Sequence, residues 1–152
     1  MNTTHKYRIR ATSTTVRSGL TVAEGVDPSI AFSAPPEFKG QAGHWTPEHF
    51  LVAAVASCFI STFSGMAANS KFEFVSLELE SEGIIAQEEA GWRFREVVLR
   101  PRLSIARTED KELGNRLLHK AEKNCLVGRS LACPVVLEPA VIITEQVMVT
   151  SW

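Results

Sequence analysis

A run of 21 residues without a charged side chain, from Phe50 to Ser70, constrains most strongly what this chain can fold into. Leu, Val, Ile and Phe side chains are spread around the whole circumference of any helix that the run forms, and only small residues separate them. Cys58 lies inside the run. Such a helix, roughly 30 Å long, has no face suited to water, so something must cover it on all sides.

The start of this helix is marked by three residues in a row. Thr46 is a good N-cap, Pro47 suits the first helical position because its missing N–H needs no partner there, and Glu48 places negative charge at the positive end of the helix dipole. The pattern predicts a helix over residues 47–69.

Two kinds of cover are possible for this helix. Its length meets the criterion for a transmembrane helix, but serines and Gly65 dilute its hydrophobicity, and the flanking chain is typical of a soluble domain. The preferred interpretation is a helix buried in protein. One chain of 152 residues cannot easily cover it alone, and its small side chains would let two such helices approach closely. The sequence therefore predicts a homodimer.

The N-terminal segment shows the alternation of a β-hairpin. Residues 5–24 alternate weakly between apolar and polar side chains, and Ser18-Gly19 is a turn signal that places Arg17 at or near the hairpin tip. Asp27-Pro28 should interrupt the chain before a short strand over 29–33. Residues 34–44, rich in proline and glycine, are expected to form an irregular loop.

The remainder of the chain mixes strands with one amphipathic helix. We expect strands over 72–80, with one irregularity where the alternation slips, over 84–87 and over 92–106, the last with Pro101 at an edge or bulge. A helix is expected over 108–125, ending before a stop at Gly128, and strands over 135–144 and 146–150. Cys125 falls at the C-terminal end of the buried stripe of that second helix. These elements predict a single α+β domain over residues 1–152.

Charge and cysteine content exclude several functions. A net charge of −1 offers no electrostatic surface for nucleic acid and no polybasic patch for a membrane. Basic residues between His5 and Arg10 interrupt the apolar stretch that a secretory signal requires. The three cysteines are widely spaced and odd in number, which argues against a disulfide framework and favours a reducing cytoplasm.

Cys58 has two possible interpretations. A free cysteine is usually a small buried hydrophobe, and the alternative is a reactive thiol. Burial in mid-helix should raise the pKa of Cys58, and the helix N-terminus is too distant to reverse this, so a reactive Cys58 requires a nearby cation. No spacing typical of a zinc site, a serine-hydrolase elbow or a nucleotide loop occurs, so we expect no metal and no cofactor.

Two motifs together carry a family resemblance. The segment TPEHFLVAAVASCF, followed by AEKNCLVGRSLACPVVLE with its first cysteine 67 positions after Cys58, resembles the signature of the OsmC/Ohr family of thiol-dependent peroxidases, and most closely its general OsmC-like branch. The resemblance extends over nearly the whole chain. It implies an OsmC-like fold, in which antiparallel β-sheets surround a long buried central helix in an intertwined homodimer.

The resemblance also implies roles for particular residues. Cys58 corresponds to the reactive cysteine, Cys125 to the second cysteine, and Glu48 to the carboxylate that orients an arginine. That arginine maps onto Arg17 in the N-terminal hairpin, with Lys39 in the loop before Pro47 as the alternative. Cys133 matches no functional position and is interpreted as structural.

The implied activity is reduction of small apolar organic hydroperoxides, an antioxidant role under oxidative stress. Cys58 would become a sulfenic acid, Cys125 would close a disulfide with it, and an external dithiol or thiol would reduce that disulfide. Aromatic side chains at 50, 59 and 63, together with the loop over 34–43, are candidates to line an apolar cleft. The alternative is a non-catalytic dimer that binds an apolar or lipid-like ligand or acts as a thiol redox sensor.

Overall fold

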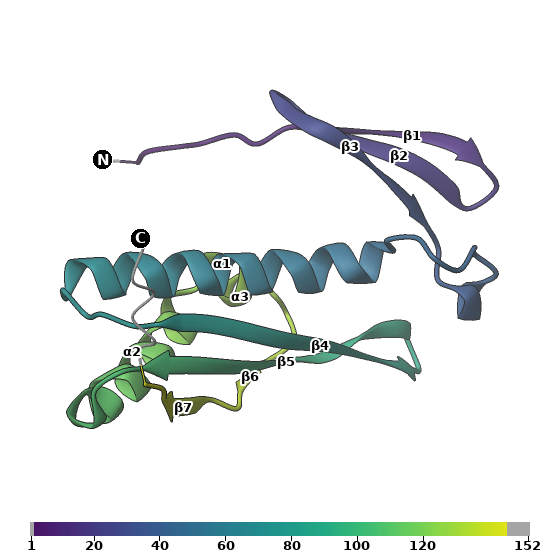
Figure 1. Ribbon diagram of the computed structural model, residues 1–152. Coiled ribbons are helices and arrows are strands. Elements are labelled where there is room, and N and C mark those ends of the chain that lie inside the picture. Colours follow the sequence, from purple (N-terminus) through teal and green to yellow (C-terminus); the bar gives the residue numbers. More distant parts are fainter. Residues whose placement is uncertain (1, 146–152) are drawn as a thin grey trace. The chain divides into compact units, whose positions relative to one another are not determined.

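The computed structural model describes residues 2–145, which form two compact units (Figure 1). The boundary falls between Leu51 and Val52, inside the long helix α1. The described parts of the units are therefore residues 2–51 and 52–145, and each is considered by itself.

The first unit is built on a three-stranded antiparallel sheet in the order β1-β2-β3. The strands span Ile9–Thr15, Ser18–Ala23 and Val26–Ser33, and a short 3-10 helix, η1, follows at Pro36–Phe38. The predicted hairpin is confirmed.

The β1–β2 turn was misplaced by two residues, because Ser18 and Gly19 pair within β2 and the reversal occurs at Val16-Arg17. Arg17 adopts a left-handed conformation there, with φ +65°. Gly19 is needed for space rather than for turning, since a Cβ at this position would lie 2.5 Å from the Thr12 carbonyl oxygen and 2.7 Å from the Phe32 ring.

Pro28 lies inside β3, which contradicts the expected break at Asp27-Pro28. The strand is at an edge of the sheet, and its register with β2 shifts between Thr21 and Ala23. A proline at an edge strand or an irregularity removes no hydrogen bond from the ladder, which explains why the strand tolerates it.

Helix α1 spans Pro47–Asn69, as predicted. The backbone N–H of His49 donates to Thr46 Oγ1 at 3.2 Å, and the Thr46 N–H donates to His49 Nδ1 at 3.1 Å. This reciprocal pair is a capping box in which histidine takes the place of the usual glutamate. It satisfies two of the N–H groups at the start of the helix.

The second unit holds a larger sheet. Strand β4, Ser76–Glu88, pairs antiparallel with β5, Gly91–Ile105, and the other side of β5 pairs in parallel with β6, Val135–Leu137, and with β7, Ala140–Ile143. Its helical elements are η2, Thr108–Asp110, helix α2, Lys111–Asn124, and the short helix α3, Leu126–Arg129.

Four boundaries in this unit differ from expectation. The strand expected from residue 72 begins at Ser76. The two strands predicted around Gly83 are one continuous strand, and Gly83 makes room for neighbours, since a Cβ there would lie 2.6 Å from Val52 and 2.7 Å from Phe94. Gly128 lies within α3 and does not stop a helix. The predicted strand over 135–144 is divided at Glu138-Pro139, and the strand expected over 146–150 lies outside the described residues.

Pro101 is buried in β5, between two neighbouring strands rather than at an edge. On one side it pairs with Leu79. On the other, β6 ends its pairing at Leu99 and β7 begins at Arg102, so Pro101 falls in the gap between these partners. The missing N–H of proline therefore removes no ladder bond.

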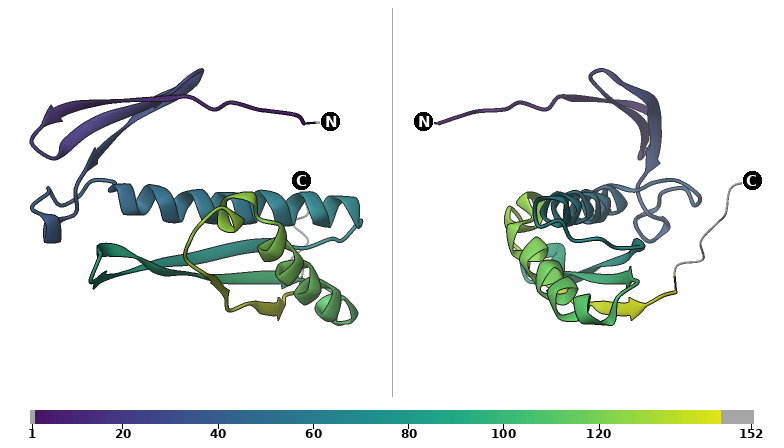
Figure 2. Two further views of the ribbon diagram at one scale, coloured as in Figure 1. Left: turned by 180° about the vertical axis from the view of Figure 1, so that it is seen from behind. Right: turned by 60° about the vertical axis from the view of Figure 1, so that its left-hand side comes forward.

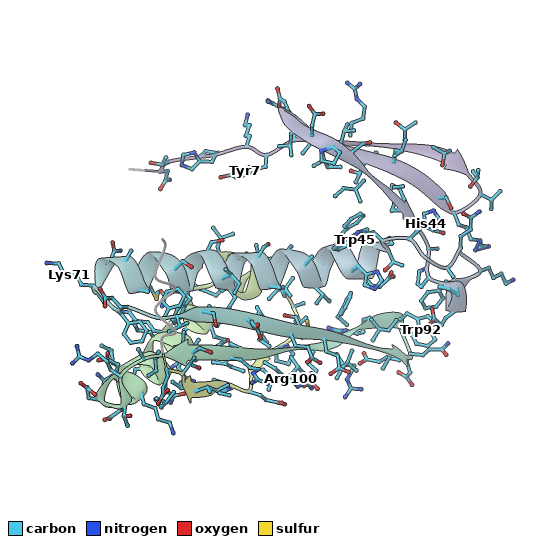
Figure 3. The ribbon with its side chains drawn as sticks, in the orientation of Figure 1. Tyr7, His44, Trp45, Lys71, Trp92 and Arg100 are labelled. Carbon is cyan, nitrogen blue, oxygen red and sulfur yellow. The ribbon has the colours of Figure 1, made fainter. Side chains whose placement is uncertain are left out.

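Helices α1 and α2 cover one face of this sheet, as the views in Figures 1 and 2 show. Helix α1 contributes a buried stripe of residues spaced one helical turn apart, namely Val55, Phe59, Phe63 and Ala67. Gly114 of α2 lies against Leu103 of β5 and Phe72. The opposite face is charged, and there Arg100 forms ion pairs with Glu82 at 2.9 Å and with Glu138 at 3.1 Å (Figure 3).

The remaining circumference of α1 is partly or fully exposed in the single chain. Exposed positions recur at spacings of three and four along it, at Ala54, Ser57, Ser61, Ser64 and Ala68. The second unit by itself therefore does not bury this helix on all sides. Within the described residues α1 is also long and apolar enough to meet the length and composition criteria for a membrane-spanning helix.

Candidate active site

The second unit brings Cys58 and Cys125 together. Cys58 lies in the middle of α1. Cys125 is both the C-cap of α2 and the N-cap of α3, and α3 lies beside α1 (Figure 2). The two thiols interact, since each acts on the pKa of the other, and both are free. The Cys125 thiol also donates to the Val55 carbonyl oxygen at 3.8 Å. This confirms the expected position of Cys125 on the buried face at the end of the second helix.

The surroundings of Cys58 correct the prediction that its pKa is raised. Partial burial alone raises the pKa of Cys58, but hydrogen bonds outweigh it and the net pKa is lowered. In decreasing order, the bonds come from the backbone of Val127, the Cys125 side chain, the Thr62 side chain and the backbone of Leu126. Neutral donors that favour a thiolate therefore lower the pKa of Cys58 without the cation that we expected to be required.

The pKa of Cys125 moves in the opposite direction, to about 11. Burial is the main cause, and the hydrogen bond and negative charge of Cys58 add to it, while the Gly128 N–H, 3.5 Å from the Cys125 sulfur, acts against it. The environment thus favours one thiolate at Cys58 and a protonated thiol at Cys125. A reactive thiol paired with a protonated one can form a disulfide in two successive steps.

Sequence reasoning missed Thr62, Leu126 and Val127. Thr62 follows Cys58 by four residues on the same helix, and its Oγ1 lies 4.0 Å from the Cys58 sulfur. Its spacing was sufficient to indicate this contact, because residues four apart share a helix face. The two backbone N–H groups carried no signal, since they depend on how α3 packs beside α1.

Arg17 and Lys39, the two candidate cations, belong to the first unit. Arg17 Nη1 donates to the Phe38 carbonyl oxygen at 3.1 Å, and the Arg17 carbonyl oxygen accepts from the Ala34 N–H at 2.8 Å. Lys39 caps η1 in a left-handed conformation. The Arg17 side chain is therefore held against the loop that precedes α1.

Glu48 lies in the first turn of α1, ten residues before Cys58. Ten residues of helix correspond to about 15 Å, so Glu48 does not touch Cys58 within one chain. Its Oε2 atom is enclosed and makes no hydrogen bond within the described part of the chain. An enclosed carboxylate oxygen without a donor is costly, and a guanidinium is the group best suited to satisfy it.

The aromatic side chains proposed for an apolar cleft separate into two groups. Phe59 and Phe63 are fully buried in the core, so they do not line a cleft. Phe50 stacks on Trp45 with ring centroids 5.8 Å apart and meets Phe32 edge-on at 6.3 Å.

No candidate metal site occurs within residues 2–145, where His, Cys, Asp and Glu side chains do not gather in groups of three or more. Cys133 is free and half-buried, in the segment between α3 and β6.

Comparison with known families decides which family the chain belongs to. Residues 40–139, which include α1, Cys58 and Cys125, match the family described as OsmC-like protein. The chain belongs to the OsmC-like family. The Bacillus subtilis (strain 168) protein YmaD, described as uncharacterized, is 27% identical over 137 residues, which cover 88% of this OsmC-like chain and 91% of YmaD.

Solved structures confirm an OsmC-like fold. An OsmC-like protein of unknown function from Vibrio cholerae superposes with a TM-score of 0.80 at 23% identity, covering 90% of this chain and 99% of that one. An organic hydroperoxide resistance protein OsmC from Legionella pneumophila gives 0.75 at 20%, covering 93% and 100%. The organic hydroperoxide resistance protein OhrB of Bacillus subtilis gives 0.67 at 18%, covering 90% and 98%. The mixed α and β architecture with a long central helix was thus predicted correctly.

Proposed function

We propose that this OsmC-like protein is a thiol-dependent peroxidase that reduces organic hydroperoxides. The observation that carries the proposal is the interacting pair of free thiols whose pKa values are moved apart, with Cys58 lowered and Cys125 raised. A nucleophile and a protonated partner in contact are the two components that a two-cysteine peroxidase needs.

The reaction proceeds in three balanced steps. The Cys58 thiolate attacks the distal oxygen of ROOH, the O–O bond breaks, and the leaving alkoxide takes a proton to become an alcohol, which leaves Cys58 as a sulfenic acid. The Cys125 sulfur then attacks the Cys58 sulfur, and its proton leaves with the hydroxide as water. An external dithiol or thiol donates two electrons through a mixed disulfide and restores both thiols.

Arg17 and Glu48 are assigned supporting roles in this proposal. Glu48 accepts hydrogen bonds from the Arg17 guanidinium, in the same chain or from the second subunit, and the guanidinium contacts the peroxide and stabilises the departing alkoxide. The enclosed and unpartnered Glu48 Oε2 supports such a pair. Lys39 remains the alternative cation.

The proposed setting is a cytoplasmic homodimer. The exposed row of small side chains on α1 lies in an uncharged segment, and a second copy of the same helix would remove it from water. The proposed substrate is small and apolar, consistent with the names of the organic hydroperoxide resistance proteins that share the fold.

Turnover with a defined reductant tests the proposal. Purified protein is mixed with cumene hydroperoxide and dithiothreitol, and peroxide loss is followed over time. We expect Cys58→Ser to abolish catalysis and Cys133→Ser, the matched control, to remain active. Cys125→Ser should form the Cys58 sulfenic acid but no intramolecular disulfide, so that any turnover depends on attack of dithiothreitol on that sulfenic acid. Wild-type protein that consumes no peroxide above the buffer rate would refute the peroxidase, and a single oxidation without turnover would favour the redox sensor.

A further inference from the structure

Thr62 differs from the other hydroxyl residues in the middle of α1. The Ser57 hydroxyl donates to the Ala54 carbonyl oxygen at 3.2 Å, and the Ser61 hydroxyl donates to the Ser57 carbonyl oxygen at 2.6 Å. Such bonds to the preceding turn are the ordinary arrangement for serine and threonine in a helix. The Thr62 hydroxyl instead contacts the Cys58 sulfur, with Oγ1 4.0 Å from Sγ.

The direction of this hydrogen bond follows from the charge of the sulfur. Either atom can donate when Cys58 is a thiol, but a thiolate carries no hydrogen, so the Thr62 hydroxyl must then be the donor. A donor aimed at a charged sulfur stabilises it more than it stabilises the neutral thiol, because hydrogen bonds to ionised groups are the stronger ones.

Two further donors reach the same sulfur from a different part of the chain. The backbone groups of Leu126 and Val127 act on Cys58 as donors that lower its pKa, and both residues belong to α3, which Cys125 caps through the Gly128 N–H. The titratable group that faces Cys58 from this neighbouring segment is Cys125. The groups that lower the pKa of Cys58 against the effect of burial are thus neutral donors on two elements, α1 and the segment around α3.

We propose that Thr62 is a positioning residue for Cys58, whose hydroxyl donates to the sulfur and, together with the backbone N–H groups of Leu126 and Val127, holds it as a thiolate. The proposal rests on the reactive-cysteine role assigned to Cys58 above. It separates two tasks: the neutral donors maintain the nucleophile, and the Arg17–Glu48 pair is left to act on the peroxide.

The pH dependence of Cys58 alkylation tests this role directly. Reduced protein is treated with limiting iodoacetamide across a range of pH, and modification of each cysteine is followed by peptide mass spectrometry. Thr62→Val keeps the branched shape of the side chain but removes its donor. We expect Thr62→Val to be alkylated at Cys58 about three- to tenfold more slowly at neutral pH, the range that corresponds to loss of one modest hydrogen bond.

The shape of the profile distinguishes positioning from packing. The Thr62→Val and wild-type rates should converge at alkaline pH, where both proteins are fully ionised at Cys58, and Thr62→Ser should restore the wild-type profile. Ser61→Ala, the matched control one residue away, should leave the profile unchanged. Thr62→Ala serves as a second donor-free variant if Thr62→Val fails to fold.

A Thr62→Val profile that coincides with that of the wild type, or that is slowed equally at every pH, would overturn the proposal. Alkylation requires no peroxide, so its result is independent of the proposed catalysis. If the profile moves but hydroperoxide oxidises neither thiol, the peroxidase assignment fails and the Thr62 role stands. If hydroperoxide forms the disulfide but the profile does not move, only the Thr62 role fails.

Discussion

The opposite pKa shifts of Cys58 and Cys125 predict a large difference in their reactivity in the folded protein. At pH 7, a thiol whose pKa is about 11 is ionised in roughly one molecule in ten thousand, whereas a thiol at the ordinary value of 9.0 is ionised in about one in a hundred. Cys58 lies below the ordinary value, so its thiolate fraction exceeds that of Cys125 by at least about a hundredfold. Because the thiolate is the reacting species, alkylation should favour Cys58, by less than this ratio since a thiolate of higher pKa is intrinsically the better nucleophile.

Limited alkylation of the reduced protein measures that preference. The protein is treated at pH 7 with substoichiometric iodoacetamide, and peptides containing Cys58 and Cys125 are quantified by mass spectrometry. In urea both cysteines should react at similar rates, which provides the control for intrinsic peptide differences. Cys125 should react faster in Cys58→Ser, since the negative charge of Cys58 is one cause of its raised pKa, but more slowly than in urea because burial remains. Equal labelling of the two cysteines in the folded wild type would contradict the opposite pKa shifts of Cys58 and Cys125.

Two further predictions concern the core and the candidate cation. Phe63→Ala removes a fully buried ring whose centroid lies 5.4 Å from that of Phe74, so it should lower the free energy of unfolding by about 3–5 kcal/mol. Chemical denaturation measures this loss, with Ser64→Ala at the exposed neighbouring position as control. A loss of stability similar to that of the control would contradict the packing. Arg17→Ala should slow hydroperoxide turnover while leaving the pH profile of Cys58 alkylation unchanged, because neutral donors lower the pKa of Cys58. An alkylation profile displaced to higher pH would show instead that Arg17 stabilises the Cys58 thiolate.

The long helix was predictable because its signals are local and mutually consistent. Thr46, Pro47 and the uncharged run that follows specify a start, a direction and a length, and the structure has the same boundaries, Pro47–Asn69. The position of Cys125 at the end of an amphipathic helix was predictable for the same reason. In both cases the residues that determine the element lie within it.

Glycine and proline were misleading where tertiary packing determined their use. Gly19, Gly83 and Pro28 resemble turn or break signals, yet all three lie within strands. The two glycines are required because Phe32 and Val52 pass close to the backbone, and Pro28 is tolerated because β3 is an edge strand. None of these neighbours is adjacent in sequence, so the local pattern could not show whether a glycine or proline is there for close packing within a strand or for a turn of the chain.

The reactive role of Cys58 stays a prediction, whereas the groups that lower its pKa were not foreseen. The spacing of the motifs assigned the role, but the contributions from Val127, Cys125 and Leu126 come from far along the chain. From the sequence, burial was expected to dominate the pKa of Cys58, so a nearby cation was expected to be necessary for a reactive thiol. The packing of α3 beside α1 supplies hydrogen bonds instead, and no pattern in either segment indicates that contact.

The central claim is that Cys58 and Cys125 form one redox unit, and disulfide mapping tests it most directly. Reduced wild-type protein is treated with one equivalent of cumene hydroperoxide, remaining thiols are blocked, and the digest is analysed without reduction. We expect a mass loss of two hydrogens located in a peptide pair that joins Cys58 to Cys125, with Cys133 recovered in its blocked form because its thiol was still free. Protein that retains all three thiols, or that forms a disulfide through Cys133 instead, would contradict it.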